Sequence, residues 1–125
     1  MEKYLLVFLG GGAGSLLRLL FTKWFPPGGA SFPTATFLAN FLASLLAGFL
    51  ASLLMKSSGS DWPKYLLFIG FCGGLSTFST FSVENISLME NGKTSLALFY
   101  IFATIFLTFF AAWGGFSIHK AIFVK

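Results

Sequence analysis

Five hydroxyl side chains and three phenylalanines are gathered in one stretch, residues 70–84, which reads GFCGGLSTFSTFSVE. The hydroxyls belong to Ser76, Thr77, Ser79, Thr80 and Ser82. Phe78 and Phe81 are three residues apart and share a helix face, and the three glycines before them form helix poorly. In hydrocarbon, a helix break is tolerated only where the freed backbone groups are buried in protein or line a cavity. A break at residues 73–77 therefore predicts a buried or water-lined polar site.

Packing is the competing explanation for the same residues. Small residues in membrane helices usually let neighbouring helices approach closely. The chain has 18 phenylalanines, and two more at helical spacing are most often lipid-facing or packing residues. On spacing alone, packing is the commoner role for Phe78 and Phe81.

The composition indicates a membrane protein. Of the 125 residues, 56% are hydrophobic and only 10% are charged, and the mean hydropathy is +0.84. Four apolar runs each reach the ~20 residues that cross a ~30 Å hydrocarbon core: residues 3–23, 34–55, 64–89 and 94–119. Turn-forming residues separate them at 26–29, 57–60 and 91–92. We expect one all-α domain, residues 1–125, with four transmembrane helices and the third broken in mid-membrane.

The charged residues flank these runs, so the net charge of +4 forms no basic patch and does not indicate nucleic acid as a partner. With four spans, both termini and the 56–64 connection share one side of the membrane. That side carries Lys3, Lys56, Lys64, Lys120 and Lys125, and the other carries Arg18, Lys23 and Lys93 on it or near it. This is a weak positive-inside bias. It fits ordinary insertion with the N-terminus inside, or insertion in both orientations.

The remaining reactive side chains give little sign of catalysis. Cys72 is the only cysteine, which excludes an intrachain disulfide and any cysteine-based metal motif. No nucleophile–base pair or metal-ligand cluster is visible, so we expect no enzyme. His119 lies beside Lys120 and is expected at the membrane interface, with no ligand role.

The run 34–55 repeats small or polar side chains every four residues, which places them on one helix face. They are Thr36, Asn40, Ser44, Gly48 and Ser52. A helix–helix interface explains Ser44, Gly48 and Ser52. It explains Asn40 less well, because a carboxamide in mid-membrane needs partners for two N–H donors and an acceptor.

The run 94–119 repeats this spacing, with Tyr100, Thr104 and Thr108 on one face. Each threonine hydroxyl could instead bond to the carbonyl four residues earlier, as is usual in membrane helices. The row therefore predicts either a polar track or three separately satisfied hydroxyls.

Two ionisable residues stand apart from the helix-end charges. Arg18 follows Gly14 by one turn, and an arginine near the end of a span is costly unless it snorkels or faces a cavity. Glu84 is the only acid well away from a predicted helix end, although the third run is close to ending there. Structural roles at the interface remain open for both.

These motifs together resemble one family. GGLSTFSTF is similar to the GGLTTFSTF signature of the Fluc (CrcB) fluoride channels and departs from it only at Ser76. The GGxxGxxxR pattern ending at Arg18 also resembles that family, and the resemblance covers the whole chain. It implies a fluoride-selective channel of the cell (inner) membrane, an antiparallel homodimer with two pores that lets fluoride leave the cytoplasm passively.

The resemblance also implies which residues serve the ion. The fluoride pathway would include Arg18, Asn40, Phe78, Ser79, Thr80, Phe81, Glu84, Tyr100, Thr104 and Thr108. Amide and hydroxyl donors would replace the water around fluoride, and phenylalanine ring edges carry the positive part of the ring quadrupole. An acid beside an anion path repels the ion unless the acid is protonated or hydrogen-bonded, and this condition applies to any pathway role of Glu84. A structural sodium ion at the dimer centre would be held by the main-chain carbonyls of Gly73 and Ser76.

Two other classes compete with this assignment. A small multidrug transporter also has four helices and dual topology, but it needs a carboxylate deep in the first helix, where this chain has only Glu2 at the very start. A non-transporting membrane assembly subunit would explain the small-residue faces. It would not explain Asn40 together with a broken third helix.

Overall fold

The computed structural model of the chain describes residues 1–28, 31–55 and 61–123. Its elements in chain order are α1 (Glu2–Trp24), α2 (Thr34–Leu54), the π-helix η1 (Lys64–Cys72), α3 (Gly73–Leu75), α4 (Phe78–Glu90) and α5 (Thr94–Phe123). Lys56, the 57–60 connection and Lys125, which entered the charge argument, lie outside the described residues, as does Gly29 of the 26–29 connection.

Four helical segments are long and apolar enough to cross a membrane, namely α1, α2, α5 and the segment Lys64–Glu90 that runs from η1 to α4. The all-α class and the four expected spans are therefore confirmed. The ends differ slightly from the apolar runs, most at α5, which continues beyond His119 to Phe123.

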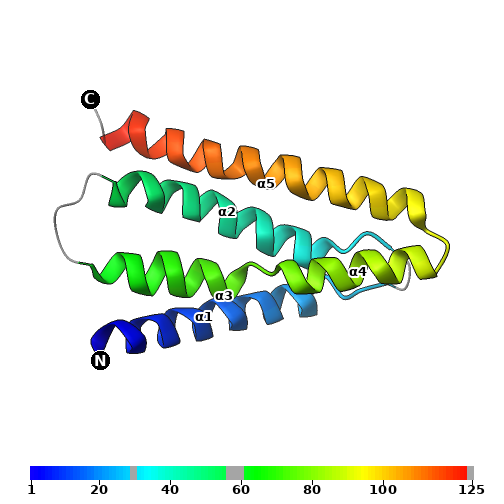
Figure 1. Ribbon diagram of the computed structural model, residues 1–125, viewed down its shortest axis with the longest axis horizontal. Coiled ribbons are helices and arrows are strands. Elements are labelled where there is room, and N and C mark those ends of the chain that lie inside the picture. The colour runs from blue at the N-terminus through cyan, green and yellow to red at the C-terminus, as the bar shows by residue number, and fades with distance from the viewer. Residues whose placement is uncertain (29–30, 56–60, 124–125) are drawn as a thin grey trace.

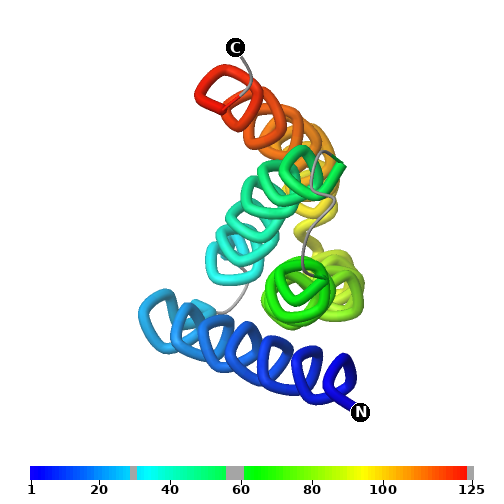
Figure 2. Tube along the Cα trace, turned by 90° about the vertical axis from the view of Figure 1, so that its left-hand side faces the viewer, coloured from blue at the N-terminus to red at the C-terminus, as the bar shows by residue number. Residues whose placement is uncertain are grey.

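The segments are arranged as a row, in the order α5, α2, the η1–α4 segment and α1 (Figure 1, Figure 2). The two edge helices, α1 and α5, make no contact with each other within the described residues. The first turn of α1 and the last turn of α5 lie at the same end of the helices (left in Figure 1), as four antiparallel spans require. A row, unlike a closed bundle, does not surround a common axis.

Small residues set the spacing within this row. A Cβ atom at Gly10 of α1 would collide with the carbonyl oxygen of Leu66 in η1. Likewise, a Cβ atom at Gly48 of α2 would collide with the carbonyl oxygen of Ala112 in α5. The packing role expected for Gly48 is thus confirmed, because only a glycine lets these backbones touch.

The η1–α4 segment changes its backbone geometry twice. η1 has the wider π-helical winding, whereas α3 and α4 are α-helical. Between α3 and α4, Ser76 (φ −74°, ψ 152°) and Thr77 (φ −152°, ψ 120°) are extended. Gly73 and Gly74, the residues with the weakest helix preference, lie in α3 and are helical.

His119 lies elsewhere than at an exposed interface. It is only 3% exposed between α5 and α2, and its Nδ1 atom is 2.9 Å from Ser52 Oγ. The rings of Phe49 and Phe123 flank the imidazole. The position of His119 at the membrane interface stays a prediction, and the structure adds that Ser52 gives the imidazole a polar partner inside the protein.

Candidate functional site

The centre of the site is a pair of hydrogen bonds between Asn40 of α2 and the backbone of Thr77. Asn40 Oδ1 accepts from the Thr77 N–H at 2.7 Å, and Asn40 Nδ2 donates to the Thr77 carbonyl at 3.1 Å. Both residues are buried. The carboxamide therefore hydrogen-bonds to the N–H and the carbonyl of Thr77, which are outside the helical pattern because the residue is extended. The second N–H of Asn40 Nδ2 takes no part in these two bonds.

The Thr77 hydroxyl starts α4. Its Oγ1 accepts from the Thr80 N–H at 3.2 Å, which is the N-cap bond of that helix. The same hydroxyl lies 2.9 Å from Thr80 Oγ1 and 3.3 Å from Ser79 Oγ. The structure thus brings Ser79 and Thr80 together as exposed hydroxyls of the first turn, linked through Thr77.

These bonds take two N–H groups away from their usual helical acceptors. In a continuous α-helix, the N–H groups of Thr77 and Thr80 would bond to the carbonyls of Gly73 and Ser76. They bond instead to Asn40 and to the Thr77 hydroxyl. The two carbonyls that the sequence analysis expected to ligate sodium are therefore the ones that lose their helical donors.

A cavity of about 260 Å³ lies beside this junction, and we call it the inner cavity. Residues of α2, the α3–α4 junction, α4 and α5 line it: Asn40, Ser44, Ser76, Thr77, Phe78, Phe81, Thr104, Ile105 and Thr108. The structure therefore brings together six of the predicted site residues that lie on different helices. Thr104 is 7% exposed, and its Oγ1 has no hydrogen-bond partner within the described part of the chain.

The two phenylalanines of the motif have opposite environments. Phe81 is 7% exposed and meets the Tyr100 ring edge-on, with ring centroids 5.0 Å apart. Phe78 is 79% exposed, although its ring centroid is only 5.6 Å from that of Phe81. Because Phe78 also lines the inner cavity, that cavity is open at the surface of this chain.

Glu84 lies at a second cavity of about 380 Å³, the outer cavity, which the residues between α1 and α2 partly cover. Its carboxylate is held on both sides, since Oε1 accepts from Thr36 Oγ1 at 2.7 Å and Oε2 accepts from the Tyr100 hydroxyl at 2.8 Å. Thr36, Thr80 and Glu84 line this cavity together. The acid is thus hydrogen-bonded, which was one of the two conditions for tolerating it beside an anion.

The two cavities follow each other along the same helices. Thr36 and Asn40 are one turn apart on α2, and Thr36 lines the outer cavity while Asn40 lines the inner one. On α4, Thr80 lines the outer cavity and Phe81 lines the inner one. Polar side chains therefore follow each other along the helices, from the outer cavity beside the α1–α2 connection to the inner cavity.

The α5 hydroxyl row is not a uniform track. The Tyr100 hydroxyl donates to Glu84, and Thr108 Oγ1 donates to the carbonyl of Thr104 at 2.6 Å. Thr108 thus takes the ordinary course of bonding to its own helix. Of the three, Thr104 alone keeps a free hydroxyl among the described residues.

Arg18 is the predicted site residue that the structure leaves apart from the others. It is half-buried on α1 and lines neither the inner nor the outer cavity as these are described. Thr22, one turn further, lines the outer cavity, and its hydroxyl donates to the Arg18 carbonyl at 3.2 Å.

The sequence analysis missed two contributors. Thr36 was placed on the polar face of the second run, but its bond to Glu84 joins residues 48 positions apart and has no local signal. Thr77 was counted as one hydroxyl among five, whereas it makes the most hydrogen bonds at the junction. Its position just before a helical run was the available sign of an N-cap.

No three His, Cys, Asp or Glu side chains in the described ranges gather in a way that could hold a metal ion. A cation at this site would have to be held by main-chain or hydroxyl oxygens. Such oxygens are the ligands that hard cations accept.

Residues 5–116 match the family described as CrcB-like protein, Camphor Resistance (CrcB). Proteins named Fluoride-specific ion channel FluC are similar over nearly the whole chain. The protein from Pyrococcus furiosus is 42% identical, over 96% of this chain and 98% of its own length. Those from Flavobacterium psychrophilum and Thermus thermophilus are 39% and 37% identical, each over 98% of this chain and over 100% and 97% of their own lengths.

Proposed function

The chain belongs to the CrcB-like family. Because relatives that are similar over nearly their full length are named fluoride-specific ion channels, we propose that this chain is a fluoride channel. The observation that carries this function is the agreement of the family match with four membrane-spanning helices. The protein is a multi-pass membrane protein and a transporter, not an enzyme. In the cell (inner) membrane it would let fluoride leave the cytoplasm down its gradient.

The proposed path runs from the outer cavity to the inner one. Fluoride holds its water strongly, so a path must offer donors in place of that water. Thr80 offers a hydroxyl at the first level, and Asn40 and Thr104 offer an N–H and a free hydroxyl at the second. The ring edges of Phe78 and Phe81 add weak attraction, which suits an ion that must also leave.

Glu84 and Arg18 would act at the entrance. Both Glu84 oxygens accept from hydroxyls, so hydrogen bonds stabilise the carboxylate, which keeps Thr36 and Tyr100 in fixed positions. Arg18 lies one turn from the outer cavity and would raise the local concentration of anions through its charge.

We propose that two chains assemble as an antiparallel dimer with two pores. The support is the incomplete wall of the inner cavity, where Phe78 is 79% exposed. The row of helices also surrounds no axis of its own (Figure 2). A second copy on this face would close the cavity, and a two-fold axis would create the same pathway twice.

A structural sodium ion between the two chains is part of this proposal. The carbonyls of Gly73 and Ser76 have lost their helical donors, and Gly73 is exposed. Four such oxygens, two from each chain, fit the donor chemistry of an alkali cation. The bound cation would raise the potential near the pathway in favour of an anion. Sodium-free buffer should increase dissociation of the dimer in detergent, and an unchanged dimer would contradict the sodium site.

The charges at the two ends of the helices allow the chain to insert into the membrane in both orientations. Among the described residues, Lys3, Lys64 and Lys120 lie at the end with the termini, and Arg18, Lys23 and Lys93 lie toward the other. Balanced charges give little preference for one orientation. A cysteine in place of Asn91, in a Cys72→Ser background, should be labelled from both sides of the membrane. Labelling from one side only would contradict dual topology.

The function itself is tested by anion efflux from liposomes that contain the purified protein. We expect rapid fluoride efflux and chloride efflux no faster than from protein-free liposomes. Comparable chloride efflux would contradict a fluoride-specific channel. Proton-coupled drug transport, or no flux at all, would favour the multidrug-transporter and assembly-subunit alternatives.

The dimer is tested by adding bulk where one chain has room for it. Within the described part of one chain, a Cβ atom at Gly73 or at Gly114 would meet no heavy atom within 4 Å. Gly73→Val should therefore disturb only a contact with the second chain, and we expect weaker dimers and reduced flux. Gly114→Val on α5 is the matched control and should change neither. Equal behaviour of the two variants would remove the α3 face from the interface.

A further inference from the structure

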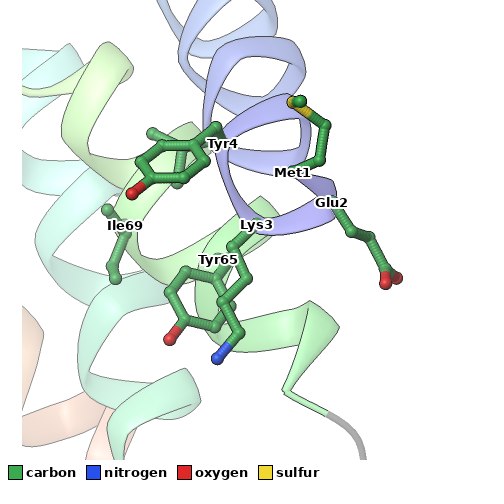
Figure 3. A pocket seen from close by; sticks show the side chains of 7 residues that line it. Met1, Glu2, Lys3, Tyr4, Tyr65 and Ile69 are labelled. Atoms are coloured by element: carbon green, nitrogen blue, oxygen red, sulfur yellow. The ribbon is translucent and has the colours of Figure 1, made fainter.

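A cavity of about 710 Å³ lies apart from the candidate pathway, between the first turns of α1 and η1. Seven residues line it: Met1, Glu2, Lys3, Tyr4, Val7, Tyr65 and Ile69 (Figure 3). α1 and η1 are in backbone contact at Gly10 and Gly70, and the cavity lies on the N-terminal side of that contact. It is therefore a wedge between two helices at the end of two membrane spans.

The mouth of this wedge carries opposite charges around one aromatic ring. Lys3 Nζ lies 4.9 Å from the centroid of the Tyr65 ring, and Lys64 Nζ lies 5.8 Å from the same centroid. Lys3 Nζ is also 3.5 Å from Asp61 Oδ2, and both of these side chains are largely exposed. The Glu2 carboxylate points away from the other labelled side chains (Figure 3).

The inner part of the wedge is apolar. Val7 and Ile69 are among its lining residues. Tyr4 and Tyr65 present their rings to the same opening (Figure 3). Tyrosine and lysine side chains at the end of a span, with apolar residues deeper, match the change from headgroup to hydrocarbon in a bilayer. The cavity thus has the polarity gradient of a phospholipid.

We propose that this wedge binds one phospholipid whose headgroup carries both a phosphate and a primary ammonium, as phosphatidylethanolamine does. The phosphate would lie between the ammonium groups of Lys3 and Lys64, and the lipid ammonium would donate to Asp61. One acyl chain would follow Val7 and Ile69. The proposal is independent of fluoride conduction, because none of these residues lines the inner or the outer cavity.

The mixed charge selects this headgroup over its two common rivals. Phosphatidylglycerol offers the lysines the same phosphate, but its uncharged glycerol gives Asp61 no cation with which to pair. Phosphatidylcholine has the same charges as phosphatidylethanolamine, but its quaternary ammonium has no N–H with which to bond to a carboxylate. A preference for ethanolamine over choline lipid thus measures the contact between Asp61 and the lipid ammonium. Total lipid retention measures the contact between Lys3 and the phosphate.

The test is native mass spectrometry of the full chain released from nanodiscs that contain the three lipids in equal amounts. We expect wild-type protein to retain the ethanolamine lipid about fivefold over each rival, the upper end of what one exposed ion pair contributes. Lys3→Gln should lower total lipid retention. Asp61→Asn should keep retention but bring ethanolamine and choline lipids to similar levels.

Lys23→Gln, at the other end of α1, is the matched control and should retain lipid like the wild type. Equal retention of all three lipids by the wild type would overturn the proposal, as would enrichment of the anionic lipid. So would lipid retention by Asp61→Asn that matches the wild type in headgroup preference. Because the wild-type measurement can decide alone, a variant that fails to fold does not leave the proposal untested.

Discussion

Asn40 and Thr104 both present polar groups to the inner cavity, yet they differ in what those groups already do. Asn40 makes two hydrogen bonds to the backbone of Thr77. Thr104 is as deeply buried but its hydroxyl has no partner among the described residues. One side chain supports the fold and has one donor to spare, whereas the other contributes only an unused hydroxyl.

This difference separates stability from conduction. Leaving a buried polar group without a partner costs about 1–3 kcal/mol, so Thr104 lowers the stability of the resting chain. Its hydroxyl can gain a bond only when an ion or water enters. Changes at Asn40 should therefore lower both stability and flux, whereas removal of the Thr104 hydroxyl should lower flux without lowering stability.

The largest effect is expected from Asn40→Asp. The carboxylate loses the bond from Nδ2 to the Thr77 carbonyl, puts an acceptor against that carbonyl and repels fluoride. We expect fluoride efflux to fall about 100-fold or more and stability to fall by roughly 1–3 kcal/mol, the cost of an unpaired buried group. Liposome efflux and thermal unfolding measure the two effects. Asn91→Asp, an exposed asparagine, is the control, and normal flux in Asn40→Asp would remove Asn40 from the pathway.

The next effect is expected from the phenylalanine pair. Phe81→Ile keeps apolar bulk but removes the ring edge and the edge-on contact with Tyr100, so flux should fall at least about tenfold with a stability loss of about 1–2 kcal/mol. Phe78→Ile should lower flux without loss of stability, because that ring is 79% exposed. If both variants conduct like the wild type, the two phenylalanines are packing residues.

A more selective effect is expected from Thr104→Val, which has nearly the same shape without the hydroxyl. Flux should fall about tenfold, the value of one hydrogen bond to a charged group. The melting temperature should stay the same or rise, because the lost hydroxyl had no partner. Thr104→Ser keeps the hydroxyl and should conduct normally. A drop in stability like that of Asn40→Asp would show that the Thr104 hydroxyl makes a hydrogen bond in the folded protein. It would contradict the proposed difference between Asn40 and Thr104.

The smallest effect is expected from Ser76→Ala. The Ser76 hydroxyl donates to the Cys72 carbonyl, which already accepts from the Ser76 N–H. Flux should remain within about twofold of the wild type and stability within about 0.5 kcal/mol. The sodium dependence of the dimer should also persist, because the proposed ligand is main-chain. Loss of that dependence would show that the hydroxyl takes part.

Much of the fold could be predicted from the sequence because membrane spans depend on length and polarity alone. The apolar runs ended within a few residues of the observed helices, and the small residues marked the close contacts. The π-helical winding of η1 had no such signal. The extended residues, Ser76 and Thr77, follow the glycines instead of coinciding with them, because Asn40 supplies hydrogen bonds from 37 residues away.

The residues that line the site were easier to predict than the hydrogen bonds between them. Spacing by four placed Asn40 on a polar face of the second run and Thr104 and Thr108 on one face of the fourth, and all three line the inner cavity. Spacing could not show that Thr108 bonds to its own helix while Thr104 stays free. Nor could it show that Glu84 is held by Thr36 and Tyr100, since the pairing depends on how three helices pack.

The bonds between Asn40 and Thr77 also bear on how the protein is made. During synthesis, α2 leaves the ribosome and enters the membrane before the residues around Thr77 exist. In that interval the Asn40 carboxamide lacks the partners that it has in the finished chain, and a polar group in hydrocarbon is costly. The first half of the protein is therefore poorly stable in the bilayer until the third span arrives. A truncated chain that stops after α2 should be a ready target for membrane proteases, whereas the complete chain should escape them.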